Sequence, residues 1–142
     1  MKKIFIILIC LSAFSFASVK KFTIEELVRD SALVCTGTLK KVSLVKTIKD
    51  KYEYGGRKFD VEYFEGEIEV HKIYKGKEKK KTIKISWSNV IGMSGNTGRK
   101  HQIGITAVWL LEKAEDKKSY DGKKFGSFKA LSHLAEVKRH LQ

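Results

Sequence analysis

Apolar residues at every second position are the feature that most restricts how this chain can fold. Ile83, Ile85 and Trp87 alternate with polar residues. Because successive side chains of a strand point to opposite faces, this spacing predicts a strand with one buried face. Residues 103–112 are apolar on both faces, which is typical of a strand in the middle of a sheet. The chain therefore has to build a sheet and cover one of its strands on both sides.

Residues 59–74 show the same alternation with one change of phase. The apolar residues are odd-numbered up to Tyr63 and even-numbered at Phe64 and Ile68. A one-residue shift turns every following side chain to the other face of a strand. We therefore predict one long, bent strand over residues 59–74, with a bulge beside Gly66.

The other segments are assigned by turn residues and helix signals. Thr23 and Glu26 form a capping box that starts a short helix, with Phe22 and Leu27 as a hydrophobic staple. A second helix closes the chain, and its apolar face consists of Leu131, Leu134, Val137 and Leu141. The remaining expected elements are a strand over 32–46 bent at Gly37, loops over 49–58 and 88–102, a charged turn over 75–81, a turn at Asp121-Gly122, and a fifth strand over 124–129.

Together these elements predict a mainly β fold. We expect a five-stranded OB-like β-barrel, flanked by the short N-terminal helix and the C-terminal helix, because long bent strands allow a small sheet to close and closure removes exposed edges. A β-sandwich is the alternative.

The amino terminus predicts export. Lys2 and Lys3 precede an uncharged apolar run over residues 4–16, and small residues lie where a signal peptidase would cut after Ala17. The run is shorter than a membrane helix requires, so we expect no stable membrane span after cleavage. The predicted organisation is a signal peptide over 1–17 and a single OB-like domain over 18–142, located in the periplasm or secreted.

Cleavage changes the cysteine count and the charge. The chain has 142 residues, two cysteines, no proline and a net charge of +13. Removal of residues 1–17 takes away Cys10 and two lysines, which leaves Cys35 and a net charge of +11. A single cysteine excludes an internal disulfide, so stability has to come from core burial and strand pairing. We expect Cys35 to be a buried apolar residue, with a reactive or intermolecular thiol as the alternative.

Three strand segments resemble small exported bacterial proteins with a netrin-like or TIMP-like OB barrel. They are Ala32-Leu33-Val34-Cys35-Thr36-Gly37-Thr38, Val70-His71-Lys72-Ile73-Tyr74-Lys75-Gly76 and Ala107-Val108-Trp109-Leu110-Leu111-Glu112. The resemblance spans most of the mature chain and implies a fold rather than an activity. Inhibitory members of the wider group chelate a protease zinc with a disulfide-tied amino-terminal cysteine. The mature chain would begin at Ser18, so that mechanism is not expected here.

The basic residues are the sequence feature that best indicates a binding partner. A positive field attracts polyanions, and outside the cytoplasm these are lipid headgroups, cell-wall polymers and acidic proteins. We therefore expect a non-enzymatic binding module that engages an envelope protein, an anionic polymer or a lipid surface. A lysine-rich composition with no ligand at all would give the same pattern. The candidate polyanion-binding residues are Lys75, Lys77, Lys79, Lys80, Lys81, Arg99 and Lys100.

Two further function classes stay open. A small hydrolase with dispersed residues could use Cys35 as nucleophile, His71 as base and Asp60 as orienting group, although no local motif supports it. Single-stranded nucleic-acid binding would need exposed aromatic residues beside the basic ones, for which Tyr52, Tyr54, Tyr63 and Tyr120 are the candidates. An exported protein rarely meets nucleic acid. The histidine spacing fits no metal motif, and we expect no metal and no cofactor.

Overall fold

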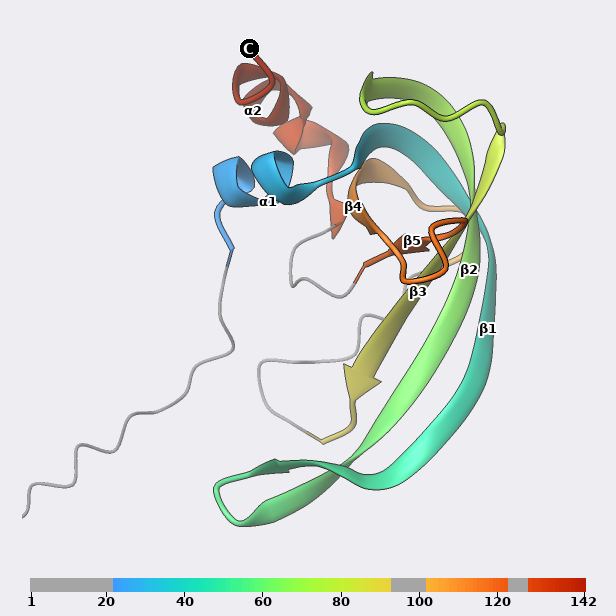
Figure 1. The fold of residues 1–142 in the computed structure, drawn as a ribbon, viewed down its shortest axis with the longest axis vertical. Helices are drawn as coiled ribbons and strands as arrows, with labels where there is room; N and C mark the ends of the chain where they lie inside the picture. Colours follow the sequence, from blue (N-terminus) through green and yellow to red (C-terminus); the bar gives the residue numbers. More distant parts are fainter. Residues whose placement is uncertain (1–21, 93–101, 123–127) are drawn as a thin grey trace, which may run out of the picture.

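The computed structural model describes residues 22–92, 102–122 and 128–142 (Figure 1). The predicted signal peptide and the boundary after Ala17 lie outside these residues. The first half of the fold consists of helix α1 (Ile24–Asp30), strand β1 (Leu33–Tyr54), strand β2 (Arg57–Lys75) and strand β3 (Thr82–Val90). The second half consists of strands β4 (Thr106–Lys113), β5 (Tyr120–Asp121) and β6 (Phe128–Lys129), a 3₁₀ turn over Leu131–His133, and helix α2 (Leu134–Arg139).

Five strands form a ring. Their order is β1-β2-β3-β5-β4, and β4 pairs again with β1 to complete it. Among the described strands, all pairings are antiparallel except the parallel pair of β3 and β5, and β6 pairs with β4. The predicted fold class, a mainly β and OB-like arrangement of five strands with a helix at each end, is confirmed.

The interior of the ring is filled by the alternating apolar residues. Ile83, Ile85 and Trp87 are almost completely buried, as their spacing predicts. Strand β4 is covered on both faces, since Trp109 lies in the ring interior and Val108 packs beneath the two helices. The indole Nε1 of Trp109 donates to the carbonyl oxygen of Gly37 at 3.0 Å, which ties β4 to β1 inside the core.

The N-terminal helix begins as predicted. The Thr23 hydroxyl accepts from the backbone N–H of Glu26, and the Glu26 carboxylate accepts from the backbone N–H of Thr23. Phe22 and Leu27 both belong to the cluster that joins the helices to β4, in agreement with the hydrophobic staple. No helix in the described parts of the chain is both long and apolar enough to cross a membrane.

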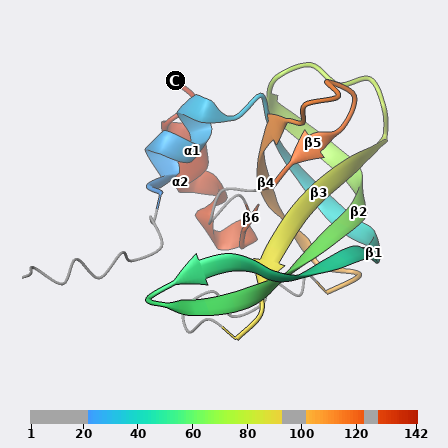
Figure 2. The ribbon, with the colours of Figure 1, turned by 60° about the horizontal axis from the view of Figure 1, so that its bottom comes forward.

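The predicted loop over residues 49–58 is wrong. These residues form the end of a long hairpin in which β1 continues to Tyr54 and β2 starts at Arg57. Gly55 and Gly56 have φ values of +57° and +74°, so both central residues of the two-residue turn lie in the left-handed region. Such a turn matches the twist of paired strands, and glycine adopts it without strain. The hairpin bends across the end of β3 (Figure 2), where the backbone N–H of Ile91 donates to the carbonyl oxygen of Asp60.

The predicted long strand over residues 59–74 is present as part of β2, and the irregularity predicted beside Gly66 lies on its partner strand. Strand β1 has an extra residue between Leu39 and Lys41, opposite Ile68 and Glu67, and another between Leu44 and Lys46, opposite Phe64 and Tyr63. Strand β2 pairs with β3 without interruption from Val61 to Glu69, and the irregularities lie in its pairing with β1. Phe64 stacks on Trp87, with ring centroids 5.5 Å apart. A Cβ on Gly66 would lie 2.9 Å from the Trp87 ring, so glycine is required on the buried face. The change of phase between Tyr63 and Phe64 therefore coincides with the irregularity between Leu44 and Lys46 in the pairing with β1.

The strand that completes the ring lies outside the range predicted for it. A turn was expected at Asp121-Gly122, but Tyr120 and Asp121 form β5, which pairs with both β3 and β4. Of the predicted strand over 124–129, the structure describes residues 128–129, which form β6 and pair with β4. Because β5 has only two residues, it shows no alternation of apolar and polar residues from which a strand could be predicted. The predicted strand over 103–112 begins only at Thr106, and the predicted loop over 88–102 starts after β3 has continued to Val90.

Candidate functional site

The candidate site is the lysine turn, which we define as residues 76–81 between β2 and β3. It confirms the charged turn predicted over 75–81. Figure 1 shows this connection running along the top of the molecule from the end of β2 to the start of β3. Gly76 has φ +90°, and a Cβ on it would overlap the carbonyl oxygen of Ala32, so the turn begins by passing closely over the start of β1. Four of its side chains are exposed lysines, Lys77, Lys79, Lys80 and Lys81.

The carboxylate of Glu78 ties the lysine turn to the ring. Glu78 accepts from the backbone N–H of Lys80 at 2.9 Å and from the hydroxyl of Tyr120 at 2.8 Å. The bond from Lys80 is the main reason that the pKa of Glu78 lies below its ordinary value. Because Tyr120 belongs to β5, these bonds fasten the turn to the ring.

The lysine turn is tied to the sheet at its far end as well. The backbone N–H of Val70 donates to the carbonyl oxygen of Lys81 at 2.7 Å. Beneath the turn, the ammonium group of Lys113 lies 4.1 Å from the centroid of the Tyr120 ring. Burial raises the pKa of Tyr120, so this ring stays neutral and donates to Glu78 at ordinary pH. The backbone of the turn is therefore fixed, while its lysine side chains extend into solvent.

The structure separates the predicted polyanion-binding residues into three groups. Lys77, Lys79, Lys80 and Lys81 share the lysine turn, and none forms an ion pair with a carboxylate of the described residues. Lys75 is engaged elsewhere, because its Nζ donates to the carbonyl oxygens of Val28 at 2.6 Å and Arg29 at 3.0 Å. Arg99 and Lys100 lie outside the described residues.

A groove adjoins the start of the lysine turn. It lies between α1, the end of β2 and the C-terminal end of α2, and has a volume of about 400 Å³. We call it the helix groove. Its lining residues are Glu25, Val28, Arg29, Tyr74, Lys75, His140 and Leu141.

Two further hollows are lined by residues of the ring strands and of the segment 114–121. The first, of about 260 Å³, is lined by β1, β2, β3 and β5 and contains the stacked rings of Phe64 and Trp87. The second, of about 500 Å³, lies between β2, β3 and residues 114–121. They share Glu65, Ser86 and Asp121, so they are two parts of one depression. No local sequence pattern predicts this depression, because it forms where β5 approaches β3.

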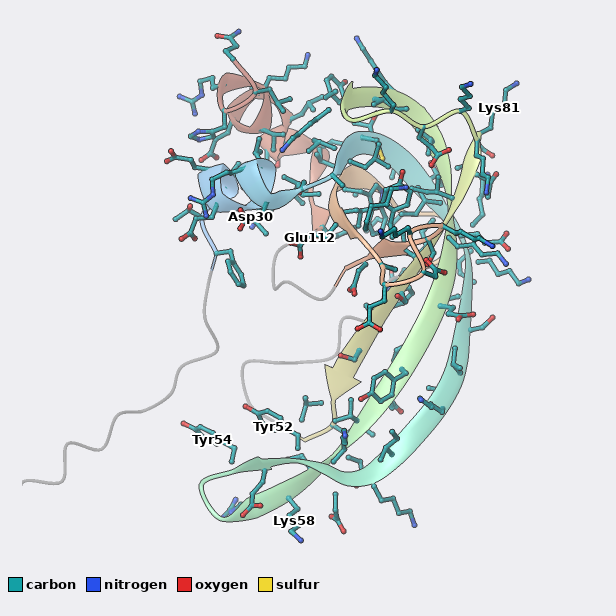
Figure 3. The ribbon with its side chains drawn as sticks, viewed as in Figure 1. Asp30, Tyr52, Tyr54, Lys58, Lys81 and Glu112 are labelled. Atoms are coloured by element: carbon teal, nitrogen blue, oxygen red, sulfur yellow. The ribbon has the colours of Figure 1, made fainter. Side chains whose placement is uncertain are left out.

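The aromatic residues considered for nucleic-acid stacking are not gathered at the lysine turn. Tyr52 and Tyr54 lie near the end of the hairpin, on the concave side of its bend, and Lys58 points away from that side (Figure 3). Lys81 is at the opposite end of the molecule. Tyr120 does contact the lysine turn through Glu78, but it is almost completely buried and offers no ring face for stacking.

The dispersed catalytic trio is not assembled. Cys35 is fully buried in the ring interior, and burial raises the pKa of its thiol to about 12. His71 is exposed on the outside, with its Nε2 3.1 Å from the hydroxyl of Thr38. The carboxylate of Asp60 accepts from the backbone N–H of Asp50 in the hairpin. Within the described residues, no group of three or more histidine, cysteine or carboxylate side chains could hold a metal ion.

Tyr74 lines the helix groove, and two lysines that were not predicted as site residues lie over its ring. The ammonium groups of Lys72 and Lys138 lie 5.4 Å and 5.3 Å from the centroid of the Tyr74 ring. Lys72 and Tyr74 are two residues apart on β2 and so share a face, which the sequence could have revealed. The approach of Lys138 from α2 depends on the tertiary fold and has no local signal.

Comparison with known proteins does not assign this chain to a family. No protein-family model matches this chain, and no curated protein sequence matches it.

Proposed function

We propose that this chain is an exported, non-enzymatic binding module that engages an extended polyanion of the cell envelope through the lysine turn. The observation that carries the proposal is that Lys77, Lys79, Lys80 and Lys81 project from a backbone fixed by Glu78 and Tyr120, with no partner carboxylate among the described residues. Fixing the backbone lowers the entropy lost when the lysines bind an anionic chain. Four unpaired charges on one turn also create a local positive field.

The choice of an envelope partner rests on the amino terminus. The positive residues Lys2 and Lys3, the apolar run over 4–16 and the small residues before Ser18 support export. The resemblance to exported netrin-like or TIMP-like OB proteins supports the same location. A polymer is favoured over a nucleic acid because the lysine turn carries no aromatic residue on which a base could stack.

The test is the affinity of the protein for heparin, used as a soluble linear polyanion, at several salt concentrations. Polyanion affinity falls with salt in proportion to the number of cationic contacts. The triple variant Lys79→Gln, Lys80→Gln, Lys81→Gln should lose affinity and reduce the slope of log K against log salt by about two to three. The matched control Lys49→Gln, Lys51→Gln, Lys58→Gln removes the same charge from the distal hairpin and should bind as the unmodified protein does. Equal losses in both variants would show a diffuse charge effect and overturn the proposal.

Two parallel measurements separate this function from its alternatives. Vesicles of phosphatidylglycerol mixed with phosphatidylcholine test a lipid surface, and a single-stranded oligonucleotide tests nucleic acid. We expect both to bind more weakly than heparin at equal charge concentration. Preferential binding of either probe would replace the polymer as the partner.

A further inference from the structure

The edge of β1 that faces away from β2 is paired along only part of its length. Within the described chain, β4 pairs with this edge up to Thr38, whereas β1 continues to Tyr54. Backbone bonds between Leu39 and residues 104–105 end the contact. Figure 1 shows the remaining part of the edge on the outside of the molecule. We call residues 40–48 of β1 the open edge.

The open edge has the backbone groups that a further strand requires. A strand paired on one side keeps a row of N–H and C=O groups on the other, and an extended peptide can pair with that row. The pairing with β2 is irregular at Lys40 and Val45, so residues 41–44 form the longest regular stretch. Because bulges bend a strand, this edge fits a short peptide strand better than a long one.

Apolar side chains on the open edge would gain from such a partner. Leu44 and Val45 are 53% and 52% exposed, although they are neighbours in the middle of the edge. A strand beside them would lie within reach of both, since residues opposite each other in paired strands contact one another. Burial of exposed apolar surface favours binding.

The charge of the open edge indicates that the partner is acidic. Residues 40–48 contain three lysines and no acidic residue, and two more lysines follow at 49 and 51. Lys40 lies 3.7 Å from Glu69, whereas Lys41 and Lys46 form no ion pair with a carboxylate of the described residues. Carboxylates opposite these lysines would form favourable cross-strand pairs.

The glutamates of β2 do not cancel this preference. An added strand would lie about 5 Å from β1 and about twice as far from β2. Its charges would therefore interact mainly with the lysines of the open edge, because the attraction falls with distance and is screened by salt.

Strand β2 itself shows which kind of sequence pairs with β1. Residues 60–69 place carboxylates between apolar side chains, and Lys41 lies opposite Glu67 in the existing ladder. A second copy of the chain has no such strand to offer, because its own β2 is paired with β1 on one edge and with β3 on the other. Pairing of two open edges would bring lysines of both copies together, which disfavours it. The partner is therefore a different chain.

We propose that the open edge binds a short acidic segment of another protein as an added β-strand. The backbone of the segment pairs with β1, and its carboxylates lie beside the lysines of the edge. This surface is separate from the lysine turn, since Lys81 lies at the opposite end of the molecule from Tyr52 and Lys58 (Figure 3). The inference therefore does not depend on the proposed function.

The experiment uses a short peptide in which glutamate alternates with threonine or valine. Its binding to the whole protein is titrated at low salt, and backbone amide hydrogen exchange is measured with and without the peptide. We expect saturable binding and slower exchange at alternate amides between Lys41 and Ile48, because pairing protects the N–H groups of the edge. Binding without this protection would show a loose electrostatic contact and overturn the proposal.

Two control peptides separate backbone pairing from charge. The first has proline in place of threonine and valine, so it keeps the charge but loses backbone donors, and it should bind at least about tenfold more weakly. The second has lysine in place of glutamate and should not bind. The proposal fails if either control peptide binds as tightly as the glutamate peptide.

Charge reversal of the protein provides a test in the opposite direction. The variant Lys46→Glu, Lys49→Glu, Lys51→Glu should lose the glutamate peptide and bind the lysine peptide. The matched control Lys79→Glu, Lys80→Glu, Lys81→Glu changes the lysine turn by the same charge and should keep the glutamate peptide. Equal affinity of both variants for the glutamate peptide would contradict the proposal. If the first variant does not fold, the three peptides on the unmodified protein still decide the outcome.

Two further results keep this proposal apart from its alternatives. Dimerisation of the unmodified protein that protects the same amides would assign the open edge to a second copy and overturn the proposal. A failure of heparin binding would remove only the proposed function, because the peptide titration does not use the lysine turn.

Discussion

At the scale of single residues, Cys35 shows how burial determines reactivity. Its thiol lies in the ring interior, where no water stabilises the thiolate, and its pKa rises to about 12. The sequence predicted the burial correctly from the apolar run around Cys35.

The raised pKa of Cys35 predicts a loss of stability at high pH. In the unfolded chain the thiol releases its proton near its ordinary pKa of about 8.5, while the folded protein keeps it. The unfolded state then binds fewer protons, so the free energy of unfolding should fall by about 1.4 kcal/mol per pH unit between about pH 9 and pH 12. Urea unfolding at pH 8, 9 and 10 measures this fall. Cys35→Ala is the control for other groups that titrate in this range, and an identical slope in the variant would contradict the prediction.

Gly76 is a second residue whose surroundings allow the effect of a substitution on stability to be predicted. Its φ of +90° and the carbonyl oxygen of Ala32 both exclude a side chain. Gly92 has a similar φ of +81°, but nothing lies within 4 Å of the position of its Cβ. Backbone strain alone costs about 1 to 3 kcal/mol, so Gly76→Ala should reduce the free energy of unfolding by clearly more than Gly92→Ala. Thermal or urea unfolding of the two variants measures the difference, and similar losses would show that the close approach to Ala32 has no energetic effect.

At the scale of elements, Lys75 joins α1 to β2. The sequence placed it among the polyanion-binding residues because it begins a run of lysines. In the structure its ammonium group instead bonds two carbonyl oxygens, those of Val28 and Arg29, in the last turn of α1. The last carbonyl groups of a helix lack partners within the helix, and a cation there also interacts favourably with the helix dipole.

Replacement of Lys75 tests this structural role. Lys75→Met keeps most of the apolar stem and removes the ammonium group, and it should reduce the free energy of unfolding by about 1 to 3 kcal/mol. Lys77→Met is the matched control, since that exposed lysine forms no described hydrogen bond and should change stability by less than about 0.5 kcal/mol. Urea unfolding measures both. Equal free energies of unfolding in the two variants would contradict this structural role, and Lys75 would then be available to bind a ligand.

At the scale of the whole molecule, the sequence predicted the elements whose apolar residues repeat at a regular spacing. It identified the long strands, the helix at each end and β4 as the strand covered on both faces, because each has a repeating apolar pattern. The sequence did not predict the strand pairing at the end of the hairpin. Polar residues such as Lys49 and Lys51 interrupt the apolar alternation there, although the two strands remain paired. The sequence also missed β5, which has only two residues and exists because β3 and β4 hold it between them.

The candidate site was predictable only in part. The lysine turn was evident as a run of charge, but its fixation by Glu78 and Tyr120 joins residues 42 positions apart. The helix groove depends on contacts between the two ends of the chain. Long-range contacts of this kind leave no pattern in a local window of sequence.

The bond from Trp109 to Gly37 has a consequence for the rate of folding. It joins residues 72 positions apart, in the two strands that complete the ring. Loop-closure entropy opposes such contacts before they form, whereas the β1–β2 hairpin needs only a two-residue turn. The hairpin should therefore form first and β1–β4 pairing late, so that folding takes milliseconds to seconds, as in other small domains built from non-local strand pairs. During that interval the buried faces of β1 and β4 are exposed together, and aggregation competes with folding at that stage.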